Sequence, residues 1–344
     1  MASHRRPKQP SRARVTVLTT AAAAAVVLSA QAANAAPSEK LNKDEVKSKV
    51  DKLYEEAEQA TEKYNGAKEK QEKLQKEIST IQDSVARGQE DLNGLRDSMG
   101  LAAAAQYRTG SIDSSLQLFL SADPDDYLDK ASTLDQLSGQ QVEALKKIQE
   151  KQRELAQERT EASDKLKDLA STRTELGKKK KEVQAKLAEA QKLLNTLTAK
   201  EKAALAAADA RASRSASSRV DLGNTTSASG RAAAAFSAAR SQLNKPYVYG
   251  ATGTASYDCS GLTSWAYAQA GVTIPRTSQA QASAGTRIYS QSDLRVGDLV
   301  IFYGDQHHVG LYAGNGQVLH APRTGTVVRY ESIGNMPFQF GVRI

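Results

Sequence analysis

Heptad spacing of apolar residues constrains this chain more than any other feature, because it commits about half of the sequence to a coiled coil. Between about Leu41 and Ala210 the chain is rich in Lys, Glu, Gln, Ala and Leu and has almost no proline. In the first arm the apolar residues recur in alternating steps of four and three, which predicts a helix with a coiled-coil seam. Gln71 and Gly88 interrupt the pattern, so we expect a bendable coil. The seam residues are Val46, Val50, Leu53, Ala57, Ala60, Tyr64, Ala67, Leu74, Ile78, Ile81, Val85, Leu92, Leu95 and Met99.

A second arm repeats the pattern in another register from Leu145 to Leu197, and residues 107–128 separate the two arms. We predict that residues 36–211 form an antiparallel helical hairpin about 100 Å long, at about 1.5 Å per residue. A parallel dimer of long helices is the alternative. An apolar segment, residues 116–120, falls at the expected tip, and such a patch either folds back on the hairpin or marks a partner site.

The first 35 residues have the layout of a secretory signal peptide. Five basic residues precede an uncharged run from Val15 to about Ala30, and Ala33-Asn34-Ala35 gives a cleavage site. We therefore expect a secreted protein that works outside the cell. Removing these five basic residues lowers the formal net charge of +8 to +3, so the charge gives little reason to expect a nucleic-acid partner.

Composition changes again towards the C-terminus. Residues 212–230 are Ser, Ala, Gly, Thr and Asn with scattered Arg, which predicts a flexible linker. Residues 231–344 carry most of the aromatic side chains and can form a core of their own. Two helices followed by a run of short strands predict an α+β domain. We expect the helices at 232–243 and 260–270 and the strands at 298–303, 308–313, 317–321, 326–330 and 338–344.

Cys259 is the only cysteine, so the chain has no internal disulfide. It stands between Asp258 and Ser260 where the second helix of this domain begins, and a helix N-terminus favours the thiolate by lowering the pKa of the thiol. The sequence thus indicates a reactive nucleophile. The alternative is a small buried apolar residue, which most free cysteines are.

A thiolate nucleophile needs a base, and a base needs an orienting group. In the strand that begins near His308, Val309 and Leu311 point to one face and His308 to the other, so we expect His308 in a cleft and His307 towards solvent. A three-residue turn around Asn315 would place Gly310 opposite His320 and bring both rings to one face. We predict that turn, with a glycine in the left-handed region.

Six motifs in this domain resemble, in order, those of the NlpC-type cell-wall cysteine peptidases: "PYVYG", "DCSGL", "PRTSQAQ", "VGDLVIF", "HHVGLYAG" and "VLHAP". The resemblance implies a papain-like fold with Cys259 as nucleophile, His308 as general base and His320 as its orienting partner. It also implies that Tyr247 lies beside the oxyanion site and that Asp258 and Ser260 line the substrate pocket. The implied substrate is the γ-D-glutamyl–diamino acid bond of peptidoglycan stem peptides, cleaved without a metal or other cofactor.

The coil resembles those of RipA- and RipC-like exported wall hydrolases, in which the coil engages a division-associated membrane complex of the FtsEX type. The matching segment is 116–137, which suggests that the hairpin restrains or positions the peptidase. Two other functions stay open. One is a non-enzymatic adaptor that binds stem peptides. The other is a zinc amidase using His308, His320 and Cys259 or Asp305, although the adjacent His307 and His308 have no metal-ligand spacing.

Overall fold

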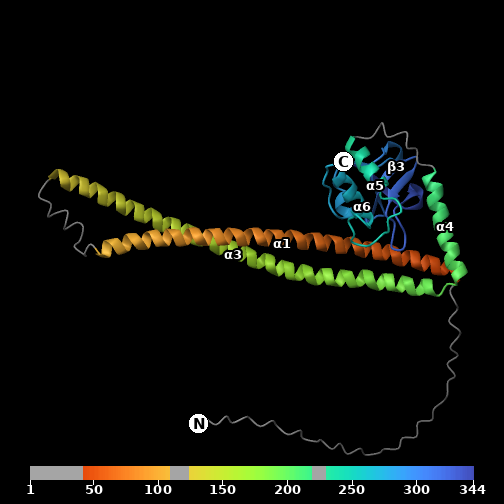
Figure 1. Ribbon diagram of the computed structural model, residues 1–344, viewed down its shortest axis with the longest axis horizontal. Helices are drawn as coiled ribbons and strands as arrows, with labels where there is room; N and C mark the ends of the chain where they lie inside the picture. The colour runs from red at the N-terminus through yellow and green to blue at the C-terminus, as the bar shows by residue number, and fades with distance from the viewer. Residues whose placement is uncertain (1–41, 109–123, 219–229) are drawn as a thin grey trace, which may run out of the picture. The chain divides into compact units, whose positions relative to one another are not determined.

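The structure, a computed structural model, describes residues 42–108, 124–218 and 230–344 (Figure 1). The predicted signal peptide, the apolar segment 116–120 and most of the predicted linker lie outside these residues. Residues 42–344 form one compact unit. Among the described helices, none combines the length and the apolar character needed to cross a membrane.

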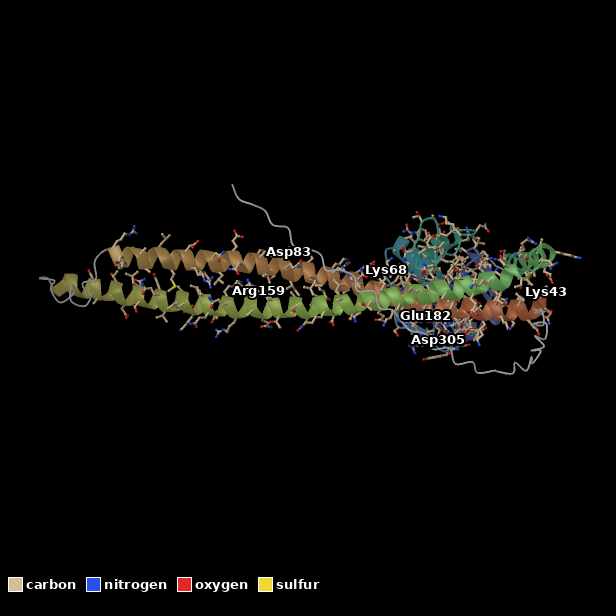
Figure 2. The ribbon with its side chains drawn as sticks, turned by 90° about the horizontal axis from the view of Figure 1, so that it is seen from below. Lys43, Lys68, Asp83, Arg159, Glu182 and Asp305 are labelled. Atoms are coloured by element: carbon tan, nitrogen blue, oxygen red, sulfur yellow. The ribbon has the colours of Figure 1, made fainter. Side chains whose placement is uncertain are left out.

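Two long helices, α1 (Lys43–Arg108) and α3 (Pro124–Asn195), form the hairpin. Asn42 caps α1 through the backbone N–H groups of Asp44 and Glu45, and the Glu45 side chain accepts from the Asn42 N–H, which is a capping box. The two helices lie side by side (Figure 2). They run in opposite directions, because residues further along α1 contact residues earlier in α3. These pairs are Glu56 with Lys186, Glu77 with Lys165 and Ser84 with Glu158. The antiparallel hairpin is confirmed.

The predicted heptad residues form the seam between the two helices. Val46 and Val50 pack with Ala190, and Leu92 packs with Leu155. Gly88, which interrupts the heptad, is where Leu155 approaches most closely: a Cβ on Gly88 would lie 2.8 Å from a Leu155 methyl carbon. The glycine therefore makes room for a large side chain, and α1 runs through it without a break.

A third helix, α4 (Ala199–Ser217), was not predicted as a separate element. The chain turns after Asn195, and Thr198 starts the new helix with a capping box: its hydroxyl accepts from the Glu201 N–H, and the Glu201 carboxylate accepts from the Thr198 N–H. Because α4 continues to Ser217, the predicted start of the linker at residue 212 is wrong. The alanines of 203–210 favour helix, and they carry it into the serine-rich segment.

The C-terminal domain combines three helices with a six-stranded antiparallel sheet, in the strand order β1-β6-β2-β3-β4-β5. This is the predicted α+β class, although β1 and α7 were not expected. The helices are α5 (Gly230–Arg240), α6 (Cys259–Gln269) and α7 (Ser278–Gln281), with 3-10 turns η2 (Gln291–Asp293) and η3 (Ile333–Asn335). The strands are β1 (Thr286–Ile288), β2 (Leu299–Phe302), β3 (His308–Gly314), β4 (Gln317–His320), β5 (Arg329–Ser332) and β6 (Phe338–Arg343).

Helix α6 packs against one face of this sheet and so holds Cys259 near the first residue of β3. Leu262 and Ala266 of α6 share a fully buried core with Val309 and Leu311 of β3. As predicted, this apolar pair faces the core, and His308 borders a polar cavity instead.

The β3–β4 hairpin has the predicted register, but the predicted three-residue turn is wrong. Leu311 pairs with Leu319 and Tyr312 with Val318. The turn itself is the two-residue Asn315-Gly316 pair, both with positive φ, and a bulge between Tyr312 and Gly314 takes up the extra residue. The glycine at 310 is required here, because a Cβ there would lie 2.9 Å from the Cβ of His320.

Candidate active site

Cys259 is the first residue of α6, and the carboxylate of Asp258 fixes the helix end. That carboxylate accepts from the Gly261 N–H at 2.7 Å, as an N-cap does, and from the Gly250 N–H at 2.9 Å. Arg276 completes its surroundings with an ion pair at 2.6 Å. Asp258 is therefore a buried anchor that sets the position of the sulfur.

A chain of hydrogen bonds orients His308. Its Nε2 lies 2.7 Å from Nδ1 of His320, and Nε2 of His320 lies 3.2 Å from the carboxylate of Glu331. Because a carboxylate only accepts, His320 donates from Nε2 and accepts at Nδ1. His308 must then donate from Nε2, which directs its Nδ1 towards the cysteine side of the site.

The charge states of His320 and Glu331 agree with this assignment of donors and acceptors. Burial lowers the pKa of His320, so this ring is neutral. Burial opposes ionisation of Glu331 as well, but His320 and Arg329 outweigh it and hold the pKa of Glu331 far below its usual range. The sequence prediction missed Glu331, which comes eleven residues after its partner His320 and lies on the next strand, β5.

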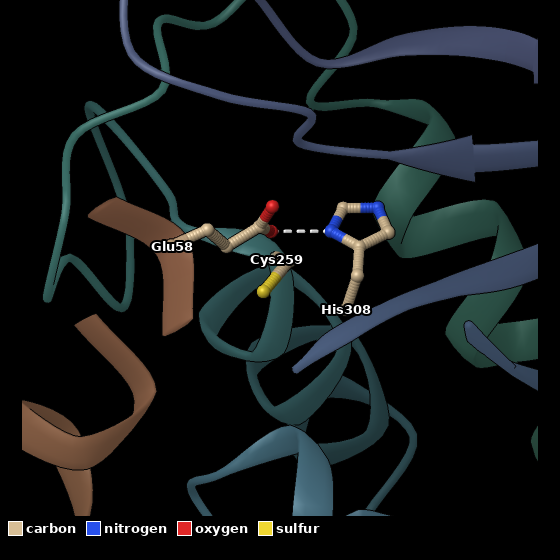
Figure 3. A group of neighbouring side chains, drawn as sticks. All are labelled: Glu58, Cys259 and His308. Atoms are coloured by element: carbon tan, nitrogen blue, oxygen red, sulfur yellow. Dashed lines mark hydrogen bonds and ion pairs between the residues drawn. The ribbon is translucent and has the colours of Figure 1, made fainter. Parts of the chain in front are cut away.

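The atoms that would react lie together, but a third side chain is bonded to one of them. The cysteine sulfur and a ring nitrogen of His308 lie within 4.8 Å of each other and of a carboxylate oxygen of Glu58, which comes from α1 (Figure 3). Nδ1 of His308 is hydrogen-bonded to that carboxylate. The nitrogen that should receive the thiol proton is thus occupied by a residue of the coil.

One turn further along α1, Glu62 occupies the other side of the sulfur. Its Oε1 lies 3.7 Å from the sulfur and accepts from the Ser260 hydroxyl at 2.7 Å, while its Oε2 accepts from the Ser278 N–H at 2.7 Å. Only 2% of Glu62 is exposed. The carboxylate is held as a bound ligand would be, and it closes the approach to Cys259.

Three further contacts dock α1 beside this pair of glutamates. The Asn65 amide donates to Asp258 at 3.1 Å, Tyr64 packs edge-on against Tyr249, and the Arg323 guanidinium stacks over Tyr54. Each pairs a residue of α1 with one of the C-terminal domain. One continuous helix is therefore both an arm of the hairpin and the cover of the candidate active site.

Docking of α1 reverses the expected ionisation of Cys259. Burial, reinforced by Glu62, Glu58 and Asp258, raises the pKa of the thiol well above its ordinary value. The expectation of a lowered pKa from the helix N-terminus is wrong for this arrangement. The sulfur is fully buried, yet carboxylates of α1 lie over it, so its burial depends on the docked helix.

Docking of α1 also raises the pKa values of two groups around the sulfur, Glu62 and His308. Burial, followed by the charge of Asp258, raises the pKa of Glu62 to about 7. For His308 burial acts in the opposite sense, but the adjacent Glu58 outweighs it and raises the pKa. The raised pKa favours the imidazolium form of His308, which donates from both nitrogens and cannot act as a base.

The remaining predicted residues also lie near the cleft. Ser260 contacts Glu62, and Tyr247 is buried near Glu58 and Cys259, which together with its burial raise the pKa of its phenol. The prediction for His307 is wrong. It is buried, stacks on Tyr303 and is hydrogen-bonded to Asp305.

Besides Glu331, four residues of the site were not assigned from sequence. Arg276 and Ser278 belong to the quoted "PRTSQAQ" motif, so a signal for them was present. Glu58 and Glu62 had none, because their spacing on a coil is that of any solvated face. The nearest indication was the pair of tyrosines, Tyr54 and Tyr64, on an arm otherwise poor in aromatic residues.

A cysteine at a helix N-terminus, facing a histidine that a second polar residue orients, is the site of a papain-like cysteine hydrolase domain. The comparisons agree: residues 244–341 match the model of the NlpC/P60 family. This part of the chain is an NlpC/P60 domain.

Curated relatives match over the same part. The chain is 53% identical over 106 residues to the probable endopeptidase Cgl2188 of Corynebacterium glutamicum, covering 31% of this chain and 50% of the relative. It is 41% identical over 102 residues to the probable endopeptidase Rv2190c of Mycobacterium tuberculosis, covering 30% and 26%. The chain thus spans half or less of the length of these relatives.

Solved structures align with about a third of the chain. The NlpC/p60 domain of the peptidoglycan hydrolase SagA is 34% identical, with 33% of this chain and 98% of that one covered and a TM-score of 0.32. A structure of the resuscitation promoting factor interacting protein RipA, mutated at E444, is 30% identical, with 33% and 61% covered and a TM-score of 0.31.

The raised pKa of Glu62 predicts that α1 docking weakens as the pH rises. A free glutamate titrates near 4.5 and the docked one near 7, so between these values the docked state holds one more proton. Docking is then strongest below pH 4.5 and is progressively lost up to about pH 7, by up to about tenfold per pH unit. The raised pKa of His308 also weakens α1 docking as the pH rises, and its effect falls at higher pH than that of Glu62.

Hydrogen exchange of the Ser278 amide, which donates to Glu62, measures this opening. Its protection factor should fall from pH 5 to 6.5 in the native chain and stay level in Glu62→Gln. The Tyr312 amide, bonded to Asp298 within the domain, is the internal control and should show no such change. Equal pH dependence in the native chain and in Glu62→Gln would contradict the assignment.

Proposed function

We propose that the protein is a secreted peptidoglycan hydrolase that cleaves stem peptides at the γ-D-glutamyl–diamino acid bond, and that α1 controls access to its active site. The observation that carries the proposal is the carboxylate of Glu62, held beside the nucleophile by Ser260 and the Ser278 N–H. The family match of residues 244–341 supports the reaction class.

The proposed reaction follows from the orientation of His308. Once Glu58 leaves, Nδ1 of His308 takes the thiol proton, and the sulfur attacks the amide carbonyl. The Cys259 N–H, which α6 leaves unpaired at its first turn, and the Tyr247 hydroxyl stabilise the oxyanion. His308 then protonates the leaving amine, and water hydrolyses the acyl-enzyme with His308 as base.

The contacts of Glu62 support the choice of bond. A γ-linked D-glutamate carries its free α-carboxylate a short alkyl spacer away from the carbonyl that is cleaved. A site that holds a glutamate carboxylate beside its nucleophile, with Arg276 bonded to the same Ser260 hydroxyl, suits such a residue. In this proposal Glu62 of α1 occupies the place of the substrate carboxylate.

A division-associated membrane complex of the FtsEX type is the proposed partner of the hairpin. Apolar side chains towards the 109–123 end of the hairpin are exposed, among them Leu101, Tyr107, Leu137 and Val142. Exposed apolar side chains on a coil support a partner site there. A partner that bends or twists the hairpin there would act on α1, the same helix that covers Cys259.

Digestion of purified peptidoglycan tests the activity. The native chain should release fragments that end in D-glutamate and fragments that begin with the diamino acid, identified by mass spectrometry. Cys259→Ala should release neither, because it lacks the nucleophile. Binding without cleavage, by the native chain and also by a chain with Glu58→Ala and Glu62→Ala, would favour the adaptor, and cleavage by Cys259→Ala would refute the thiol mechanism.

Substitution of the two glutamates tests the control by α1. Each carboxylate makes hydrogen bonds with charged or buried partners that contribute about 1.5–3 kcal/mol. The full chain with Glu58→Ala and Glu62→Ala, which removes these contacts altogether, should therefore digest peptidoglycan at least about tenfold faster than the native chain.

Glu90→Gln, an exposed substitution on the same helix, is the matched control and should leave the rate unchanged. Adding Cys259→Ala to the double variant should abolish the gain. A double variant no faster than the native chain would show that α1 does not restrain the enzyme.

A further inference from the structure

The closed site brings together three side chains that ligate transition metals. Glu58, Cys259 and His308 offer a carboxylate oxygen, a sulfur and an imidazole nitrogen, all within 4.8 Å of one another (Figure 3). All three residues are buried. Two belong to the C-terminal domain and the third to α1, so the set exists only while the helix is docked.

The charges around this set favour a cation. Three carboxyl groups, those of Glu58, Glu62 and Asp258, surround the sulfur, whereas Arg276 is the one arginine or lysine that contacts them in the described part of the chain. The same carboxylates, after burial, raise the pKa of the thiol. A divalent cation would offset this negative charge and would deprotonate a coordinating thiol.

A cavity connects two of these three ligands to solvent. Glu58 and His308 border a cavity of about 680 Å³ whose lining includes Asp51, Glu55 and Glu331. Lys47, Lys52, Arg323 and Arg329 also line it, against six carboxylates. An ion from solvent can therefore reach the ligands past groups of opposite charge.

We propose that the closed protein binds a zinc ion through Glu58, Cys259 and His308, and that the ion fastens α1 onto the nucleophile and the base. Carboxylate, thiolate and imidazole are the ligands zinc takes, at about 2.0–2.3 Å and in tetrahedral geometry, with water as a fourth ligand. In tetrahedral geometry these bond lengths separate ligand atoms by about 3.4–3.7 Å, so the three atoms shift by about 1 Å from their present positions.

The surroundings of His308 suit a zinc ligand. The ion would replace the proton that Nδ1 shares with Glu58, and Nε2 keeps its bond to His320 at 2.7 Å. A hydrogen bond of this kind orients a ligating histidine and strengthens it as a donor. Such an ion would be inhibitory, since it takes up both the sulfur and the base, and it goes beyond the proposed function because binding requires only the docked helix.

Cobalt substitution in the full chain tests this site without any substrate. Titration with Co²⁺ should give a thiolate-to-cobalt charge-transfer absorption that saturates at one equivalent and disappears when Zn²⁺ is added. Competition with a chromophoric chelator then measures the Zn²⁺ affinity. Glu58→Gln should weaken it at least tenfold, Cys259→Ser should remove the absorption, and Glu90→Gln should change neither.

Two results would overturn the proposal. One is a native chain with no thiolate-to-cobalt absorption. The other is a Glu58→Gln chain with native affinity, which would place the ion on the C-terminal domain alone. Because the readout is binding, failure of the peptidoglycan digestion would leave this result intact, and failure of cobalt binding would leave the proposed hydrolysis intact.

Discussion

Two carboxylates buried over a thiol hold this structure in its closed arrangement. Burying a charged group is expensive unless partners replace its water. Glu58 finds His308, and Glu62 finds the Ser260 hydroxyl and the Ser278 N–H. These partners are the groups that the proposed chemistry needs, so the interactions that dock α1 also disable the site. The contact is polar and raises the pKa values of Glu62, Cys259 and His308, which makes it releasable by pH in a way that an apolar interface of the same size would not be.

The hairpin gives this contact a mechanical setting. Glu58 and Glu62 lie on α1, whose opposite side pairs with α3 through residues such as Glu56 and Lys186. Because a single uninterrupted helix carries both sets of contacts, a movement of α1 away from the cleft removes both glutamates together. They leave when α1 moves, and α1 moves with its partner helix. The closed state therefore couples the coil to the chemistry through one rigid element.

Local patterns predicted most of the fold and the three central side chains. The heptad pattern predicted the hairpin. The alternation of faces along β3 predicted that His308 faces the cleft, and the register of the β3–β4 hairpin predicted that His320 lies on the same face. The alternation of faces wrongly predicted that His307 faces solvent, because β3 begins only at His308. Tyr303 stacks on the His307 ring, and Asp305 is hydrogen-bonded to it. The roles of Glu58 and Glu62 could not be predicted, since a carboxylate on a coil has the same local pattern whether it faces water or a partner about two hundred residues away. That missing contact also reversed the predicted pKa shift of Cys259.

A disulfide between α1 and the C-terminal domain tests the central claim most directly. A Cβ on Gly66 would lie 3.7 Å from Cγ2 of Thr277, so side chains at these two positions are in contact and cysteines placed there are candidates for a disulfide. In the full chain with Gly66→Cys and Thr277→Cys, oxidation should abolish peptidoglycan hydrolysis and reduction should restore it, while Gly66→Cys alone stays active under both conditions. Equal hydrolysis by the oxidised and reduced forms would contradict the account.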